Sequence, residues 1–165
     1  MSAIIISRQP GEDRERVEVE EAAVSALGDS GAEVAVVPHL SYLEPGHEAV
    51  DVLRSMDGPL AVASWLHPRP ARWVLHALGV GPAERFSCVN LADFCCGGKA
   101  AEALLDAAAG QDPGEGEGAV QEVDGEVRER WYPVLDHGRC TDCRQCLEFC
   151  LFGVYAADGG RLAVS

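Results

Sequence analysis

The sequence predicts an α/β fold, with a small doubly wound parallel sheet followed by a smaller C-terminal α+β unit. Over residues 1–109, short apolar runs alternate strictly with amphipathic segments of helical periodicity. Strands that alternate with helices are joined by right-handed crossovers, so we expect a parallel sheet with helices on both faces. A glycine-rich stretch then separates this part from a cysteine-rich segment, which is expected to form the second unit.

Four strands and four helices are expected in the N-terminal part. Asp13 can cap the first helix, which carries Ala23 and Leu27 on one side and ends near Gly28 or Gly31. In chain order, the expected elements are a strand at Ala3–Ile6, the helix after Asp13, a strand at Glu33–Val37, a helix carrying Val50, Leu53 and Met56, a strand at Pro59–Trp65, a helix at Ala71–Leu78, a strand at Phe86–Leu91 and a helix at Lys99–Ala109.

Residues 110–126 are predicted to form an acidic, glycine-rich linker. The stretch Gly110–Gly125 contains five glycines, one proline and no basic residue. Such a composition buries too little apolar surface to order itself. The sequence therefore predicts an α/β domain at 1–109, the linker at 110–126 and a small C-terminal domain at 127–165.

The charge of the chain restricts its partners. Thirteen Lys and Arg residues against 27 Asp and Glu residues give a formal net charge of −14, and Lys99 is the only lysine. An acidic surface repels nucleic acids and anionic membranes but attracts basic proteins. No apolar run approaches the roughly 20 residues of a membrane helix. The seven cysteines cannot all pair in a disulfide framework, and the sequence shows no export signal. A cytoplasmic location is therefore expected.

Four cysteines near the end of the sequence follow the spacing C-x2-C-x2-C-x3-C: Cys140, Cys143, Cys146 and Cys150. Two-residue gaps let one tight loop direct three thiolates at three corners of an iron–sulfur cube, and the fourth cysteine of such a run usually serves a different cluster. A structural zinc site is the alternative, but zinc usually requires a second C-x2-C pair about 12–20 residues away. The spacing therefore favours an iron–sulfur cluster.

The residues around these cysteines resemble the bacterial-type ferredoxin domain. Leu147 follows the third cysteine and Phe152-Gly153 lies after the fourth, as in that family, whereas Leu151 replaces the family's usual proline. The resemblance implies a ferredoxin-like α+β half-domain, in which a strand precedes the cysteine loop and a short helix and a closing strand at Arg161–Val164 follow it. It also implies a [4Fe-4S] cluster as the cofactor.

The resemblance covers only the first half of the two-cluster pattern. In that family a second cysteine run completes both clusters, but this sequence stops at Ser165. Either the chain is a fragment that lacks the second cluster half, or the missing ligands come from elsewhere, such as a second protomer in a homo-oligomer. One cluster or two are therefore expected.

A second group of cysteines lies in the α/β domain. Cys95 and Cys96 follow the fourth expected strand and precede Gly97-Gly98-Lys99. Vicinal thiols close to the start of a helix and to a lysine are expected to have lowered pKa values, which would suit them to redox chemistry or metal binding. The alternative is a pair of inert thiols at a tight turn. Cys88, on the strand itself, is expected to be a small buried core residue.

Three functions remain compatible with these motifs. The first is an iron–sulfur electron-transfer protein that exchanges single electrons with a redox partner carrying a basic docking surface. The second is an oxidoreductase subunit whose α/β domain binds a substrate or cofactor, and the third is a thiol or cluster redox sensor. The first is favoured because no loop holds a recognisable acid, base or nucleophile, and the loop at Ser7–Glu12 lacks the glycine fingerprint of a dinucleotide site. No catalytic residue is assigned.

Overall fold

The computed structural model describes residues 3–11, 13–108, 119–129 and 132–164, which form two compact units, Met1–Arg130 and Trp131–Ser165. The first unit is an α/β domain built on a five-stranded parallel sheet, and the second contains a short helix and an antiparallel hairpin. The predicted fold class is therefore confirmed. None of the helices in the described residues is both long enough and apolar enough to cross a membrane.

Strands alternate with α-helices along the first unit, and short 3-10 helices lie between some of them. In chain order the elements are β1 Ala3–Ser7, α1 Arg14–Gly28, β2 Glu33–Val37, the 3-10 helix η1 Leu40–Tyr42, α2 Glu48–Ser55, β3 Leu60–Ser64, α3 Pro68–Ala77, η2 Ala83–Arg85, β4 Phe86–Asn90, η3 Leu91–Asp93, α4 Gly97–Ala108 and β5 Val120–Glu122.

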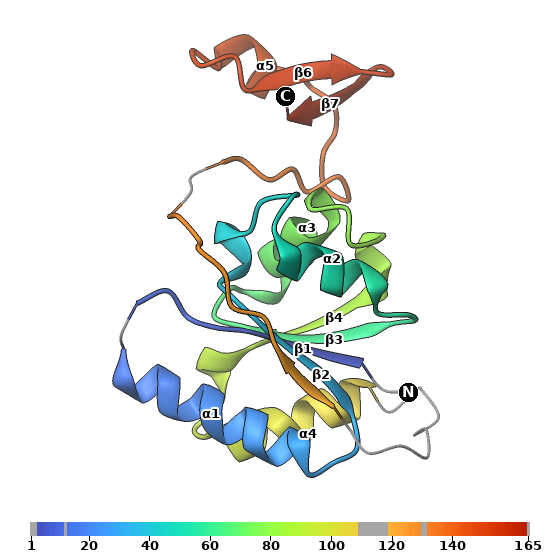
Figure 1. Cartoon of the computed structure of the whole chain (residues 1–165). Helices are drawn as coiled ribbons and strands as arrows, with labels where there is room; N and C mark the ends of the chain where they lie inside the picture. Colours follow the sequence, from blue (N-terminus) through green and yellow to red (C-terminus); the bar gives the residue numbers. More distant parts are fainter. Residues whose placement is uncertain (1–2, 12, 109–118, 130–131, 165) are drawn as a thin grey trace. The chain divides into compact units, whose positions relative to one another are not determined.

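The sheet has the strand order β4-β3-β1-β2-β5 and is covered on both faces. Helices α1 and α4 lie together on one face, and α2 and α3 lie on the other (Figure 1). Every residue of β1 and β3 is buried, because both strands are central and enclosed by helices. The strand order reverses direction between β1 and β3, and in such sheets ligands usually bind at the carboxyl ends of the strands beside this point.

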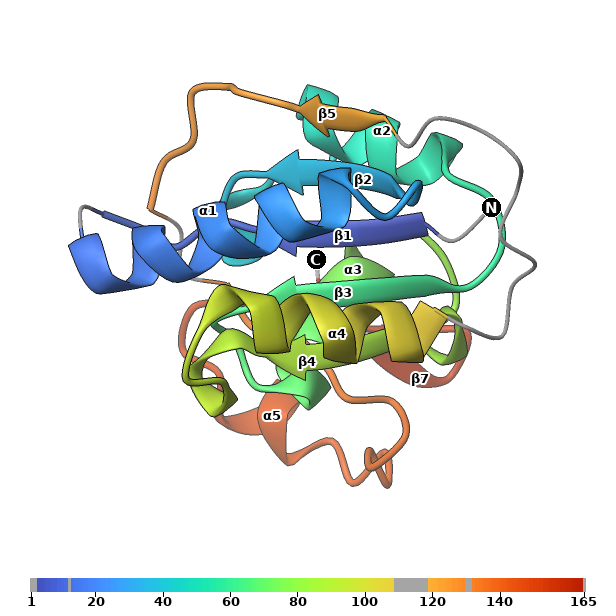
Figure 2. The same cartoon turned by 90° about the horizontal axis from the view of Figure 1, so that it is seen from below.

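The structure differs from the expected linker at residues 119–126. Val120–Glu122 forms strand β5, which pairs in parallel with β2 at the edge of the sheet (Figure 2). Ala119 O accepts a hydrogen bond from the backbone of β2 at 2.9 Å, and the amide of Val123 donates one to β2 at 2.9 Å. Strand β2 is rich in valine and its outer backbone groups need partners, so even a short acidic segment is held there. The remainder of the expected linker, 110–118, lies outside the described residues.

Two helices of the α/β domain begin earlier than expected. Helix α3 begins at Pro68 rather than Ala71, since proline is well tolerated in the first turn of a helix. Helix α4 begins at Gly97 rather than Lys99. Asp13 caps α1 as expected, because its side chain accepts hydrogen bonds from the amides of Glu15 and Arg16.

The second unit is small and has little core. Its elements are α5 Gln145–Phe149, β6 Tyr155–Asp158 and β7 Arg161–Val164, and the two strands form a hairpin. Gly159 and Gly160 both have positive φ angles, 54° and 85°, as a two-residue hairpin turn requires. The strand implied ahead of the first cysteine is not formed, since residues 132–136 have no regular structure. The closing strand at Arg161–Val164 is present, and it pairs with β6.

Candidate metal centre

The four C-terminal cysteines lie on one continuous stretch that runs from a turn, through a loop, to the end of α5. The amides of Arg139 and Cys140 both donate to the Asp136 carbonyl, at 3.0 and 2.9 Å, so Cys140 is positioned by a tight turn. Cys146 lies within α5, and Cys150 is the residue that ends that helix. All four thiols are exposed or half-buried, and none forms a disulfide.

Two non-glycine residues between these cysteines have left-handed backbone conformations. They are Asp142, with φ 52°, and Arg144, with φ 61°. This conformation costs a residue with a side chain roughly 1–2 kcal/mol. Asp142 is stabilised there, because its Oδ1 accepts a hydrogen bond from the amide of Leu162 in β7 at 3.2 Å. The cysteine loop therefore bends at two residues and is hydrogen-bonded to the β6–β7 hairpin that follows it in the chain.

Backbone amides surround the sulfur of Cys150. Hydrogen bonds from the amides of Val154, Phe152 and Gly153 lower the pKa of Cys150 below its ordinary value. Gly153 has a φ of 64°, which allows the chain to turn back over the sulfur. Burial first, and then the nearby sulfurs of Cys146 and Cys150, raise the pKa of Tyr155. Two of the four cysteines therefore lie close to one tyrosine of β6.

The donor set fits an iron–sulfur cluster in kind, although the four thiols are not gathered around one point. Among the described residues no three His, Cys, Asp or Glu side chains converge as a metal site. The segment nonetheless supplies four thiols within eleven residues, and amides directed at one of their sulfurs. Thiolates and N–H donors to sulfur are what such clusters require. Cys140, Cys143, Cys146 and Cys150 thus remain the predicted ligands.

Cys95 and Cys96 belong to the first unit and lie immediately before α4. Their Sγ atoms are 3.9 Å apart, and both side chains are exposed. The pKa of Cys96 is lowered, first by a hydrogen bond from the Lys99 amide and then by its contact with Cys95. Lys99 itself forms an ion pair with Glu102 at 2.7 Å. Cys88 differs, since burial raises the pKa of this half-buried thiol to about 11.

A buried glutamate that sequence reasoning missed occupies the point where the strand order reverses. Glu20 on α1 is only 1% exposed, and its Oε1 accepts hydrogen bonds from the Gln9 amide and from the Trp65 indole N–H, both at 2.6 Å. Gln9 follows β1 and Trp65 follows β3, so one carboxylate ties together the two loops beside the reversal. Its Oε2 has no hydrogen bond but lies 3.6 Å from the guanidinium of Arg8.

A sequence signal for Glu20 did exist. Glu20, Ala23 and Leu27 follow the spacing i, i+3, i+7, and all three are buried on the sheet side of α1. Burial raises the pKa of Glu20 above its usual value, against the opposing effect of the hydrogen bonds from Trp65 and Gln9 and the charge of Arg8. Two N–H groups beside the carboxyl ends of β1 and β3 are therefore occupied by a side chain of the protein itself.

Comparison with known proteins gives one partial match. Thirty-four residues, 21% of this chain, are 47% identical to an uncharacterized ferredoxin from Methanocaldococcus jannaschii. The match covers 23% of that protein, so the chain corresponds to about a quarter of its length. No family model matches the chain, and no solved structure matches it. The similarity supports a ferredoxin-like iron–sulfur region and leaves the type of cluster open.

Proposed function

We propose that this chain is an iron–sulfur electron-transfer protein, acting as a one-electron carrier or as an electron-transfer subunit. The observation that carries the proposal is the C-x2-C-x2-C-x3-C run, together with the 47% identity of a 34-residue segment to a ferredoxin. A [4Fe-4S] cluster held by these thiolates accepts or donates single electrons and needs no bond chemistry from the protein.

The residues of the chain would hold and tune this cofactor. Cys140, Cys143 and Cys146 would ligate one cluster, and Cys150 would ligate the same cluster or a second one. The amides of residues 152–154 would place hydrogen bonds on the Cys150 sulfur, which stabilises added negative charge. Asp142 and Glu148 add carboxylates beside the cysteines, which favours the oxidised form and lowers the reduction potential.

The α/β domain gives less support to an enzyme. In a sheet of this type a phosphate-bearing cofactor would bind beside β1 and β3. Glu20 satisfies the N–H groups of Gln9 and Trp65 there, which would otherwise be free to bind an anion. A buried carboxylate disfavours a phosphate there, whether by its charge or by the space it takes. This favours the electron carrier over a cofactor-binding oxidoreductase subunit.

Replacing Cys143 with alanine tests the proposal. The full chain, reconstituted anaerobically, should contain roughly four irons and four sulfides per cluster, with visible absorbance that bleaches reversibly on reduction. The Cys143→Ala variant should lose that iron and absorbance, and the amides of the second unit should lose protection from hydrogen exchange, because metal binding there supplies folding free energy.

The Cys88→Ala variant is the matched control, because Cys88 lies on β4 in the other unit. It should keep the iron content of the parent chain. A Cys143→Ala protein with full iron and unchanged absorbance would refute the assignment, as would a parent chain that binds zinc in place of iron.

A further inference from the structure

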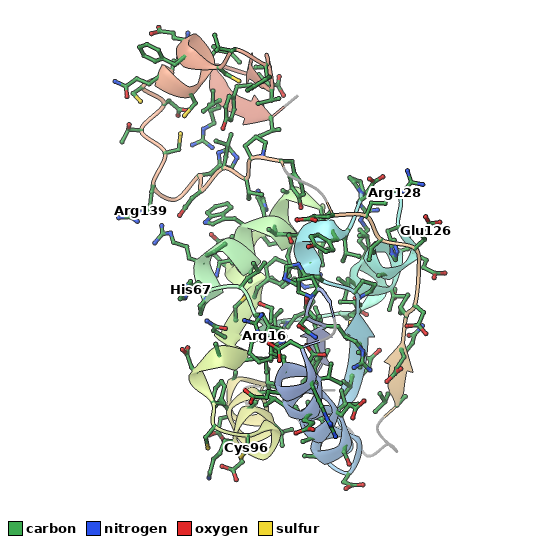
Figure 3. The ribbon with its side chains drawn as sticks, turned by 90° about the vertical axis from the view of Figure 1, so that its left-hand side faces the viewer. Arg16, His67, Cys96, Glu126, Arg128 and Arg139 are labelled. Atoms are coloured by element: carbon green, nitrogen blue, oxygen red, sulfur yellow. The ribbon has the colours of Figure 1, made fainter. Side chains whose placement is uncertain are left out.

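The proposed electron transfer leaves one pair of thiols unused, Cys95 and Cys96 at the start of α4. They lie at one end of an open groove of about 680 Å³ in the α/β domain. Trp65 and Phe94 contribute aromatic side chains to this groove, whose other wall is α1. Figure 3 labels Arg16 on α1 and Cys96 at the start of α4, which both line it.

The geometry of the two sulfurs argues against a disulfide between them. Adjacent Cα atoms are about 3.8 Å apart across a trans peptide, whereas a disulfide usually needs Cα atoms about 4.4–6.8 Å apart. No peptide bond in the described residues is cis. The two sulfurs are 3.9 Å apart, so the pair is present as two free thiols.

The same separation fits a metal chelate. A tetrahedral ion with metal–sulfur bonds of about 2.3 Å holds two of its sulfur ligands about 3.8 Å apart. The observed 3.9 Å therefore requires almost no movement of either side chain. A linear two-coordinate ion with similar bonds would need the sulfurs about 4.6 Å apart, so tetrahedral coordination fits better.

The approach of α4 to α1 positions the backbone next to the thiols. A Cβ atom on Gly97 would overlap the backbone of Val19 and would lie 2.5 Å from the amide nitrogen of Ala23. Only glycine permits the two helices to come this close, and Gly97 directly follows Cys96. The backbone next to the thiols is consequently held beside the groove by a close helix contact.

The charge of the groove favours a cation. Three carboxylates line it, from Asp13, Glu15 and Glu18, against one guanidinium, from Arg16. The guanidinium pairs with Asp13 at 3.3 Å and lies over the ring of Trp65 at 4.8 Å, and Glu18 pairs with Arg14 at 3.2 Å, so the three carboxylates outnumber the two guanidinium groups by one. A positively charged ion would be concentrated in such a groove, whereas an anionic thiol compound would be repelled.

We propose that Cys95 and Cys96 chelate a single thiophilic ion of the zinc and cadmium class, with its other coordination positions open to the groove. Thiolate pairs select such ions over magnesium or calcium. No third His, Cys, Asp or Glu of the described residues completes the site. Open positions distinguish it from a closed structural zinc site, and they suit an ion that is taken up and released or that binds a further ligand.

Alkylation of the full chain, with its iron–sulfur centre assembled anaerobically, tests the site. Cd²⁺ is added up to one equivalent, iodoacetamide follows, and peptide mass spectrometry measures the alkylation rate of each cysteine. Cys95 and Cys96 should be protected together, the rate at Cys88 should not change, and the visible absorbance of the cluster should stay constant. Zn²⁺ should give the same protection.

Cys95→Ser and Cys96→Ser are the decisive variants, and Cys88→Ser is their control. Each of the two single variants should bind Cd²⁺ about 100-fold more weakly or worse, because a chelate loses its effective concentration when one ligand is removed. The control should bind like the parent chain. Protection of only one thiol, unchanged rates at both, or undiminished Cd²⁺ affinity in either variant would overturn the proposal. Loss of cluster absorbance with both thiols unprotected would also overturn it, by placing the ion at the other cysteines.

Discussion

At the scale of single residues, Glu20 links the ionisation of one side chain to the stability of the α/β domain. Burial raises the pKa of Glu20 above its usual 4.5. A carboxyl group with a raised pKa binds its proton more readily in the folded chain than in the unfolded chain. Its contribution to the free energy of unfolding is therefore full below about pH 4.5 and is lost as the pH rises through the folded pKa.

The Glu20→Gln variant removes this dependence and keeps an oxygen that can accept from Gln9 and Trp65. We expect the free energy of unfolding of the parent chain to fall relative to that of Glu20→Gln as the pH rises from 4.5 toward neutrality. Urea unfolding followed by circular dichroism at several pH values measures the difference. Glu18→Gln, on the same helix but exposed, is the control. A difference between Glu20→Gln and the parent that does not vary with pH would contradict the expectation.

Cys88 and Cys96 should differ strongly in reactivity. The pKa of Cys88 is about 11, so its thiolate fraction at pH 8 is about 100-fold smaller than that of a thiol with the ordinary value of 9.0. Cys96 is exposed and has a lowered pKa. When no metal ion is bound at Cys95 and Cys96 of the full chain, iodoacetamide should therefore modify Cys96 at least about 100-fold faster than Cys88. Equal rates, measured by peptide mass spectrometry, would show that Cys88 is not held as described.

At the scale of elements, the contact between α1 and α4 depends on one of two neighbouring glycines. A Cβ on Gly97 would collide with the backbone of α1, whereas a Cβ on Gly98 would meet nothing within 4 Å. Gly97→Ala should therefore destabilise the domain by about 1–3 kcal/mol, as overpacking does. Gly98→Ala should be neutral or stabilise it by up to about 1 kcal/mol, because alanine is the better helix former. Urea unfolding measures both.

That pair of variants is internally controlled, because the two substitutions are identical and adjacent. Similar effects from both would mean that α4 does not approach α1 as closely as the structure indicates. A destabilised Gly97→Ala protein should also have weakened Cd²⁺ protection of Cys95 and Cys96, since the same contact positions the backbone next to the two thiols.

Periodicity in the sequence was sufficient to predict most strands and helices of the sheet domain but not strand β5. Glu33–Val37 was predicted to the residue, because its three valines lie between Gly31 and Pro38. Strand β5 was missed, because three residues in a glycine-rich, acidic stretch carry too little pattern to compete with the composition around them. Its position depends on the open edge of β2, which is a property of the tertiary fold.

The candidate functional residues also fall into those that the sequence predicts and those that depend on the tertiary fold. The cysteine motif could be recognised from the sequence because ligand spacing is a local property of the chain. In the structure, Asp142 and Arg144 have the left-handed conformations that bend this loop. The spacing of Glu20 with Ala23 and Leu27 indicated its burial, but its hydrogen bonds depend on the convergence of α1 with the loops after β1 and β3, which no local pattern encodes. The groove beside Cys95 likewise requires the packing of α1 against α4.

At the scale of the whole molecule, the strand order predicts which truncations remain soluble. A chain that ends at residue 109 lacks β5 and exposes the outer edge of β2, whose sequence Glu33–Val37 is mostly valine and alanine. Such an edge is a template for pairing with other chains. We expect residues 1–109 to associate or precipitate, whereas residues 1–129, which keep β5, stay monomeric. Light scattering over a range of concentrations compares the two, and equal behaviour would argue against a protective role for β5.

The late position of β5 also has a consequence for biosynthesis. Strand β2 ends at Val37 and its outer neighbour begins at Val120, so the ribosome must add the intervening residues before that neighbour exists. At about 5–20 residues per second, this interval lasts about 4–17 seconds. During translation the nascent sheet has an unprotected valine-rich margin throughout that period, which is when a chaperone would most benefit this protein.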